Sequence, residues 1–174
     1  RLLRLRENEM WKDDSVRLEF FDMFEQGARL IVGHYPPFPE TCLGTPRVLI
    51  VGLGRMGESI LVQVARKWRH CAGTECERLR VTIVDRSIGE RLKYLGVEYP
   101  IIDKMCDVKG VTMDVASSEF YQAEYLANEQ GVIDLTSIYV CLNNDSLGMN
   151  TALSLLESTK GLDVSIVVQM RHQR

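Results

Sequence analysis

The chain has 174 residues, and 21 Lys and Arg against 24 Asp and Glu give a formal net charge of −3. Apolar residues make up 45% of the sequence and charged residues 26%, the usual balance of a globular domain with a sizeable core. The mildly acidic balance argues against nucleic acid as a partner. No run of about 18 apolar residues occurs, so we expect no membrane-spanning helix.

The N-terminal part differs in character from the rest. Residues 1–15 are charged and irregular, and we interpret them as an arm. Short apolar segments follow at 16–21 and 28–32, where a strand–turn–strand and a helix with a strand both fit. Residues 35–39 hold three prolines, which cannot join a helix or a central strand. We therefore expect an N-terminal arm and proline-rich connector over residues 1–45.

Strands alternate with helices over residues 46–174, the predicted main domain. We predict strands over residues 47–51, 81–85, 111–113, 137–142 and 164–168. We predict helices over residues 57–69, 88–95 with Gly96 as the closing residue, 118–128, and 145 to about 161. Between them, residues 97–109 resist assignment, and 99–102 read as extended. Alternating strands and helices predict an α/β fold with a parallel, doubly wound sheet.

A glycine-rich loop connects the first strand to the first helix of this domain. Gly52, Gly54 and Gly57 form G-x-G-x-x-G directly after an apolar strand. In a Rossmann-like fold these glycines allow the tight turn, the close approach of a pyrophosphate and the packing of helix on strand. The free N–H groups of the helix N-terminus then face the phosphates. A glycine-rich turn without any ligand is the alternative.

Asp85 ends the second predicted strand, where an acid can bind the ribose hydroxyls of NAD. It follows Gly57 by 28 residues (85 − 57), more than the usual ~20, and the polar segment 70–78 accounts for the excess as an insertion. Arg86 weakens the preference for NAD, because an arginine there can meet the 2′-phosphate of NADP. Asp85 could also serve only as a turn residue.

The sequence shows no catalytic or metal-binding machinery. The five cysteines have irregular spacing, which predicts reduced thiols, and His70 with Cys71 and Cys76 offers at most three metal ligands in one loop. His34 and His172 lie away from the predicted strand ends where ligands collect, and Lys104 and Lys160 have no partner at a telling spacing. We therefore expect a protein that is not an enzyme.

The motifs from residue 47 onward resemble those of the RCK or KTN domains, which regulate potassium conductance and transport. Gly54-Arg55-Met56-Gly57 carries the arginine of that family's glycine loop, and Asp85 matches its acid. Met113-Asp114-Val115-Ala116-Ser117 resembles the end of the family's third strand but lacks its glycine. Residues 142–145 and Asn150 resemble the motif after its fourth strand, with Asn143 in place of a threonine.

The resemblance implies a cytoplasmic regulatory domain at the inner face of the cell membrane. It implies an adenine nucleotide ligand, NAD or NADH with ATP, ADP and AMP as alternatives, and homo-oligomers that act on a potassium channel or transporter. The implied contact residues are Gly52, Gly54, Arg55, Met56, Gly57, Asp85, Arg86, Asp114, Val115 and Asn143.

Two alternatives remain open: the nucleotide-binding part of an NAD(P)-dependent oxidoreductase, and a structural Rossmann-like domain without a ligand. The chain begins with Arg1 and stops just after its last predicted strand, before the family's crossover helix. We therefore expect the protein to continue beyond both ends.

Overall fold

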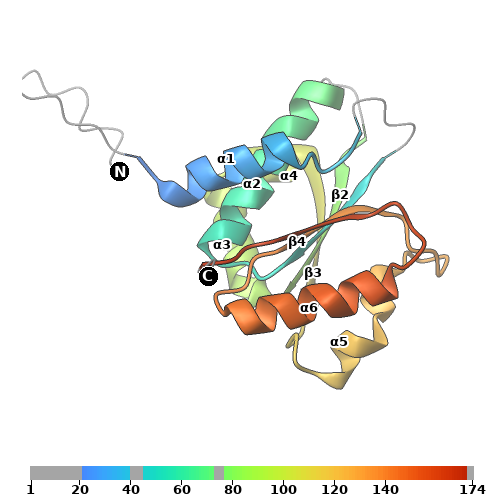
Figure 1. The fold of residues 1–174 in the computed structure, drawn as a ribbon. Helices are drawn as coiled ribbons and strands as arrows, with labels where there is room; N and C mark the ends of the chain where they lie inside the picture. The colour runs from blue at the N-terminus through green and yellow to red at the C-terminus, as the bar shows by residue number, and fades with distance from the viewer. Residues whose placement is uncertain (1–20, 40–44, 73–76, 172–174) are drawn as a thin grey trace, which may run out of the picture.

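The computed structural model describes residues 21–39, 45–72 and 77–171 (Figure 1). The strands are β1 (Arg47–Val51), β2 (Leu79–Asp85), β3 (Cys106–Thr112), β4 (Leu135–Val140) and β5 (Ser165–Val168). The helices are α1 (Met23–His34), α2 (Arg55–Ala72), α3 (Ile88–Glu98), α4 (Pro100–Met105), α5 (Ser118–Gln122) and α6 (Asp145–Ser158), with a 3₁₀ turn η2 (Glu124–Leu126). No described helix is both long and apolar enough to cross a membrane.

All five strands form one parallel sheet in the order β3-β2-β1-β4-β5. Val51 at the end of β1 pairs with Val84 on one side and Val140 on the other, so these strands end level. β1 is buried on both faces, which explains its continuous apolar run. The prediction of a Rossmann-like doubly wound α/β fold is confirmed.

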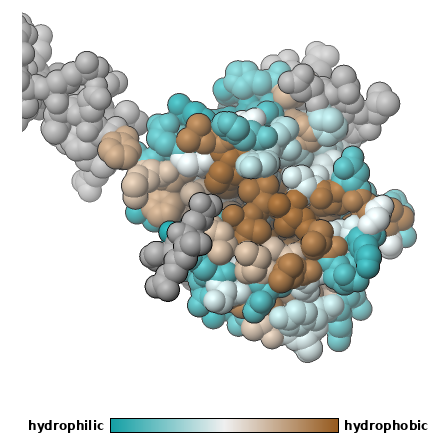
Figure 2. Space-filling model, viewed as in Figure 1, coloured by the Kyte–Doolittle hydropathy of each residue, from teal (hydrophilic) through white to brown (hydrophobic). Residues whose placement is uncertain are grey.

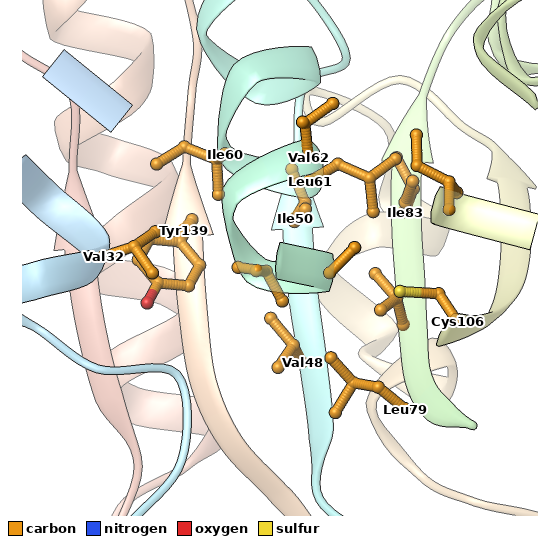
Figure 3. Packing of buried hydrophobic residues seen from close by; sticks show 14 of the residues in the cluster. Val32, Val48, Ile50, Ile60, Leu61, Val62, Leu79, Ile83, Cys106 and Tyr139 are labelled. Atoms are coloured by element: carbon orange, nitrogen blue, oxygen red, sulfur yellow. The ribbon is translucent and has the colours of Figure 1, made fainter. Parts of the chain in front are cut away.

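Helices cover both faces of the sheet. One buried cluster joins α1, α2, α3 and α4 to the sheet, and Figure 3 shows the part of it around Ile50 and Ile83. The second cluster joins α5, η2 and α6 to the opposite face, around Leu49 and Ile138. Since successive residues of a strand point to opposite faces, Leu49 and Ile50 belong to different clusters.

Helix α1 covers a part of one sheet face that the crossover helices do not cover. Right-handed crossovers from β1 to β3 place α2, α3 and α4 over that half of one face. On the same face α1 packs beside α2, and its Val32 lies against Tyr139 of β4 (Figure 3). The Tyr139 hydroxyl also donates to the Tyr35 carbonyl at 2.7 Å, and Ser137 Oγ donates to the Pro37 carbonyl at 3.0 Å. The N-terminal segment is therefore part of the main core.

Residues 28–32 belong to α1, so the prediction of a strand there is wrong. Asp22 is the N-cap of this helix, and Ala28 and Val32 repeat at helical spacing on its buried face. The segment 16–20, the first part of the other predicted element, lies outside the described residues. Residues 35–39 contain neither helix nor strand, as the prolines predict.

The ends of α2, β2, β4, β5 and α6 differ from the sequence prediction by only a few residues, but four other assignments need correction. Residues 99–102 are not extended, because Pro100 starts α4 at a position where no backbone N–H is needed. β3 begins earlier than predicted, since it is an edge strand with exposed polar residues and lacks an apolar run. The predicted helix over 118–128 breaks at Ala123, whose φ of 59° is left-handed, and Gly96 lies inside α3, which continues to Glu98.

β5 is the second edge strand, and it is only partly covered. Figure 2 shows apolar residues gathered between α1 and α6, where Figure 1 draws the β4–β5 side of the sheet. Ile166 and Val168 pack partly against the cluster under α6, whereas Val167 packs partly against the cluster under α1. Within the described residues, the outer side of β5 therefore has no neighbouring strand.

Candidate functional site

The residues that the sequence predicts as ligand contacts come together at the carboxyl ends of the strands, called here the carboxyl edge of the sheet. They follow the carboxyl ends of β1, β2, β3 and β4, which are neighbours in the order β3-β2-β1-β4. In doubly wound sheets this edge is where ligands bind, at the point where the strand order reverses. Here that point lies between β1 and β4. The residues are Gly52, Gly54, Arg55, Met56 and Gly57 after β1, Asp85 and Arg86 at β2, Asp114 and Val115 after β3, and Asn143 after β4.

Two of the three loop glycines are required by the fold itself. Gly52 has a φ of +91°, and a Cβ there would lie 2.8 Å from the Cys141 carbonyl oxygen. A Cβ on Gly57 would lie 2.0 Å from the Gly52 carbonyl oxygen, which is an impossible contact. These two glycines therefore let the β1–α2 turn pack against β4.

Gly54 differs from both, because packing does not require it. A Cβ on Gly54 would have Asn143 Nδ2 as its nearest neighbour, 4.0 Å away, and its φ is not in the left-handed region. Gly54 therefore leaves bare backbone beside open space, immediately before α2 begins at Arg55. The first N–H groups of a helix lack helical acceptors and carry its positive dipole end. This backbone can accept an anion at close range.

Asp85 links the end of β2 to the glycine loop. Its Oδ2 accepts a hydrogen bond from the Leu53 amide at 2.8 Å, and its Oδ1 accepts one from the Ser87 amide at 2.7 Å. The carboxylate is thus a turn residue and an anchor of the loop. A carboxylate has about four lone-pair sites, so both oxygens keep the capacity to accept a hydrogen bond from a ligand hydroxyl.

The residues after β2 and β3 face each other across the edge. Arg86 Nη1 lies 3.8 Å from Asp114 Oδ2, and both side chains are exposed. Asp114 Oδ1 also accepts from the Ala116 amide at 2.9 Å, which shapes the turn after β3. The Val115 side chain is only 8% exposed and packs in the core under α5, so only its backbone is available to a ligand.

Asn143 has a partner that sequence reasoning missed. Arg171 Nη2 donates to Asn143 Oδ1 at 2.7 Å, and the Arg171 amide donates to Asp145 Oδ1 at 3.0 Å. The segment after β5 is thereby joined to the loop after β4. No motif marks Arg171, because the contact spans 28 residues of sequence.

Arg91 is a second residue that the sequence did not reveal. It lies in α3, and its Nη1 donates to the Leu53 carbonyl inside the glycine loop. Glu58, in the first turn of α2, lies near the same guanidinium: burial raises the pKa of this carboxyl, while the Arg91 charge opposes that shift. The edge therefore carries guanidinium groups from several elements around the loop.

Arg55 and Met56 point from the glycine loop toward α1. Arg55 Nη2 lies 3.2 Å from Asp22 Oδ2, and the guanidinium carbon lies 4.5 Å from the centre of the Phe24 ring. Met56 packs against the cluster under α1, and a Cβ on Gly27 would lie 3.3 Å from its methyl carbon. The loop is therefore in contact with the N-terminal helix, which sequence reasoning treated as part of a separate arm.

The Cys141 thiol, just after β4, lies buried at this end of the sheet. Burial raises the pKa of the Cys141 thiol to about 12, so it stays protonated beneath the loop. His70 and Cys71 are exposed at the end of α2, while Cys76 lies outside the described residues. No group of three His, Cys, Asp or Glu residues suited to a metal ion occurs in the described part of the chain.

The fold and the loop define a Rossmann-like α/β domain with a glycine-rich turn at its topological switch point. No family model matches the sequence, and no curated protein matches it either. The resemblance to regulators of potassium conductance therefore stays a prediction.

Proposed function

We propose that this protein is a non-catalytic regulatory domain that binds an adenine dinucleotide, NAD or NADH, at the β1–α2 loop. ATP, ADP and AMP are alternative ligands of the same site. Gly54 is the observation that carries the proposal. Gly52 and Gly57 are explained by packing, but Gly54 has room for a side chain that it does not have. A phosphate group that approaches the backbone is the physical reason for a glycine at such a position.

The surroundings of the loop support a nucleotide. Asp85 lies at the end of the neighbouring strand with lone pairs to spare for ribose hydroxyls. Arg55 and Arg86 are exposed at the same edge and supply positive charge for phosphates. The Arg86 side chain is 78% exposed and its guanidinium is accessible to a 2′-phosphate, so NADP belongs among the ligands to be tested.

The regulatory role rests on the resemblance of the motifs to the RCK or KTN domains. On that basis the domain forms homo-oligomers at the cytoplasmic face of the membrane and controls a potassium channel or transporter. The nucleotide would act by preferring one of two conformations of the assembly. The absence of a histidine or reactive thiol at the carboxyl edge, within the described residues, favours this role over that of an oxidoreductase.

Thermal unfolding with each nucleotide tests the ligand. A nucleotide at about 100 times its dissociation constant should raise the free energy of unfolding by ~2.7 kcal/mol. We expect NAD or NADH to raise the melting temperature, and Gly54→Val to abolish the shift while the protein still folds. Gly89→Ala is the matched control, because Gly89 also has open space around it but lies in α3.

The outcomes separate the alternatives. If no adenine nucleotide shifts the melting temperature, the domain is a structural Rossmann-like unit and the proposal is wrong. If Gly54→Val and Gly89→Ala bind equally well, the ligand lies elsewhere. Oxidation of NADH by the protein in the presence of a substrate would favour the oxidoreductase alternative.

A further inference from the structure

Arg55 joins the glycine loop to the N-terminal helix. It is the first residue of α2 and follows Gly54 directly, yet its guanidinium contacts α1 through the Asp22 carboxylate and the Phe24 ring. The distances are 3.2 Å to Asp22 Oδ2 and 4.5 Å to the centre of the ring. The same side chain is therefore placed beside the open backbone of Gly54 and is held by α1.

Asp22 uses its two carboxylate oxygens for different purposes. Oδ1 accepts from the amides of Phe24 at 2.7 Å and Glu25 at 3.2 Å, which caps the start of α1. Oδ2 accepts from Arg55. The hydrogen bonds from the Glu25 and Phe24 amides hold the pKa of Asp22 below its ordinary value, so the residue is ionised at neutral pH. Arg55 can leave Oδ2 without loss of the helix cap.

The contact between Arg55 and Asp22 is one that a ligand can break. The Arg55 side chain is 70% exposed and that of Asp22 is 46% exposed, so water screens the pair. The pyrophosphate of a dinucleotide offers the same guanidinium a bidentate partner that carries two negative charges in total. The rest of α1 is held independently by the buried Ala28 and Val32 and by the Arg66–Glu25 pair at 2.9 Å.

We propose that nucleotide phosphates and Asp22 compete for Arg55, so that occupancy of the glycine loop releases the first turn of α1 from α2. This inference rests on the proposed nucleotide site and names its regulation. Linkage makes the coupling reciprocal. An interaction that stabilises the Asp22–Arg55 ion pair lowers the affinity for nucleotide, and bound nucleotide weakens this ion pair in turn. The N-terminal helix is therefore the element that reports whether the site is occupied.

Calorimetric titration with NADH, and with ADP as a second probe, tests the competition. Asp22→Asn keeps a good N-cap residue and removes the competing charge, so it should bind about two- to fivefold more tightly than the wild type. Arg55→Gln should bind more weakly, and Asp22→Asn should add no tightening in the Arg55→Gln background. Glu25→Gln is the control: it breaks the other α1–α2 ion pair and should leave the affinity unchanged.

Hydrogen exchange gives a readout that affinity alone does not. NADH should accelerate exchange at the first amides of α1 in the wild type and leave Asp22→Asn unchanged. Equal affinities of wild type and Asp22→Asn overturn the competition, and so does equal tightening in the Arg55→Gln background, which would mean simple charge repulsion. Failure of every variant to bind either probe overturns the proposed function, and this inference with it.

Discussion

The two ends of the sheet use the same kinds of charged side chain in opposite ways. At the amino end, Arg47 is 5% exposed, and its guanidinium donates to the carbonyls of Tyr125 at 2.9 Å and Leu126 at 2.7 Å. The same group also contacts Thr82 Oγ1 at 3.2 Å and Asp134 Oδ1 at 3.3 Å. The bonds to Tyr125 and Leu126 hold η2 against the start of β1, and the other contacts join Arg47 to β2 and to the residue before β4.

At the carboxyl end, two of the guanidinium groups, those of Arg55 and Arg86, are only loosely engaged. Arg55 and Arg86 are 70% and 78% exposed, and each has an ion pair with a carboxylate that is itself about half exposed. The comparison shows that a charged group that is buried with all its hydrogen bonds made contributes to the stability of the fold. Exposure beside open backbone leaves a charge available for a ligand.

Replacement of Arg47 should have the largest effect. Arg47→Met keeps much of the side-chain volume but removes the guanidinium donors to the two buried carbonyls, while Asp134 keeps its hydrogen bonds from Arg80 and Asn128. We expect a loss of about 3 kcal/mol or more in the free energy of unfolding, measured by urea denaturation. Arg86→Met at the other end should change it by less than about 0.5 kcal/mol. Equal losses in the two variants would erase the difference between the ends.

At the carboxyl end, substitutions of two loop glycines should distinguish a glycine that the fold requires from one that a ligand requires. Gly57→Ala forces a Cβ into the Gly52 carbonyl oxygen, so we expect a loss of about 2 kcal/mol or more, again by urea denaturation. Gly54→Ala adds its Cβ to open space and should cost less than about 0.5 kcal/mol. A large loss for Gly54→Ala would mean that packing, rather than a ligand, requires glycine there.

Two carboxyl groups should show opposite and smaller dependences on pH. Burial raises the pKa of Asp134, but hydrogen bonds from Arg80, Asn128 and Arg47 outweigh it and leave this pKa below its ordinary value. The stability that Asp134 contributes is therefore present at neutral pH and is lost as the pH falls. Asp134→Asn should cost about 1 kcal/mol at pH 7 and less near pH 3, measured by urea denaturation at both values.

Glu58 at the carboxyl end is the matched control, because burial raises its pKa. Its contribution is present at low pH and lost as the pH rises through its pKa in the folded protein. Glu58→Gln should therefore match or slightly exceed the wild type at pH 7 and lose that advantage near pH 4. If the free energies of unfolding of Asp134→Asn and Glu58→Gln, each relative to the wild type, changed in the same direction between neutral and low pH, the contrast between the two ends of the sheet would be contradicted.

Much of the sheet and of the candidate site could be predicted from local patterns. The apolar run Val48–Val51 followed by three spaced glycines indicates strand, turn and helix, because each of these depends on neighbouring residues. The strand ends at Asp85 and near Asp114 and Asn143 follow from the same alternation. Their meeting at one edge follows from parallel pairing.

Long-range contacts decided the rest. The sequence by itself determined a Rossmann-like sheet and a glycine loop, since periodicity and turn chemistry are local properties. Only the tertiary structure placed α1 on the sheet, buried Arg47, and distinguished Gly54 from Gly57, because each of these depends on atoms far away in sequence. The Arg55–Asp22 contact spans 33 residues, and no local pattern could have revealed it.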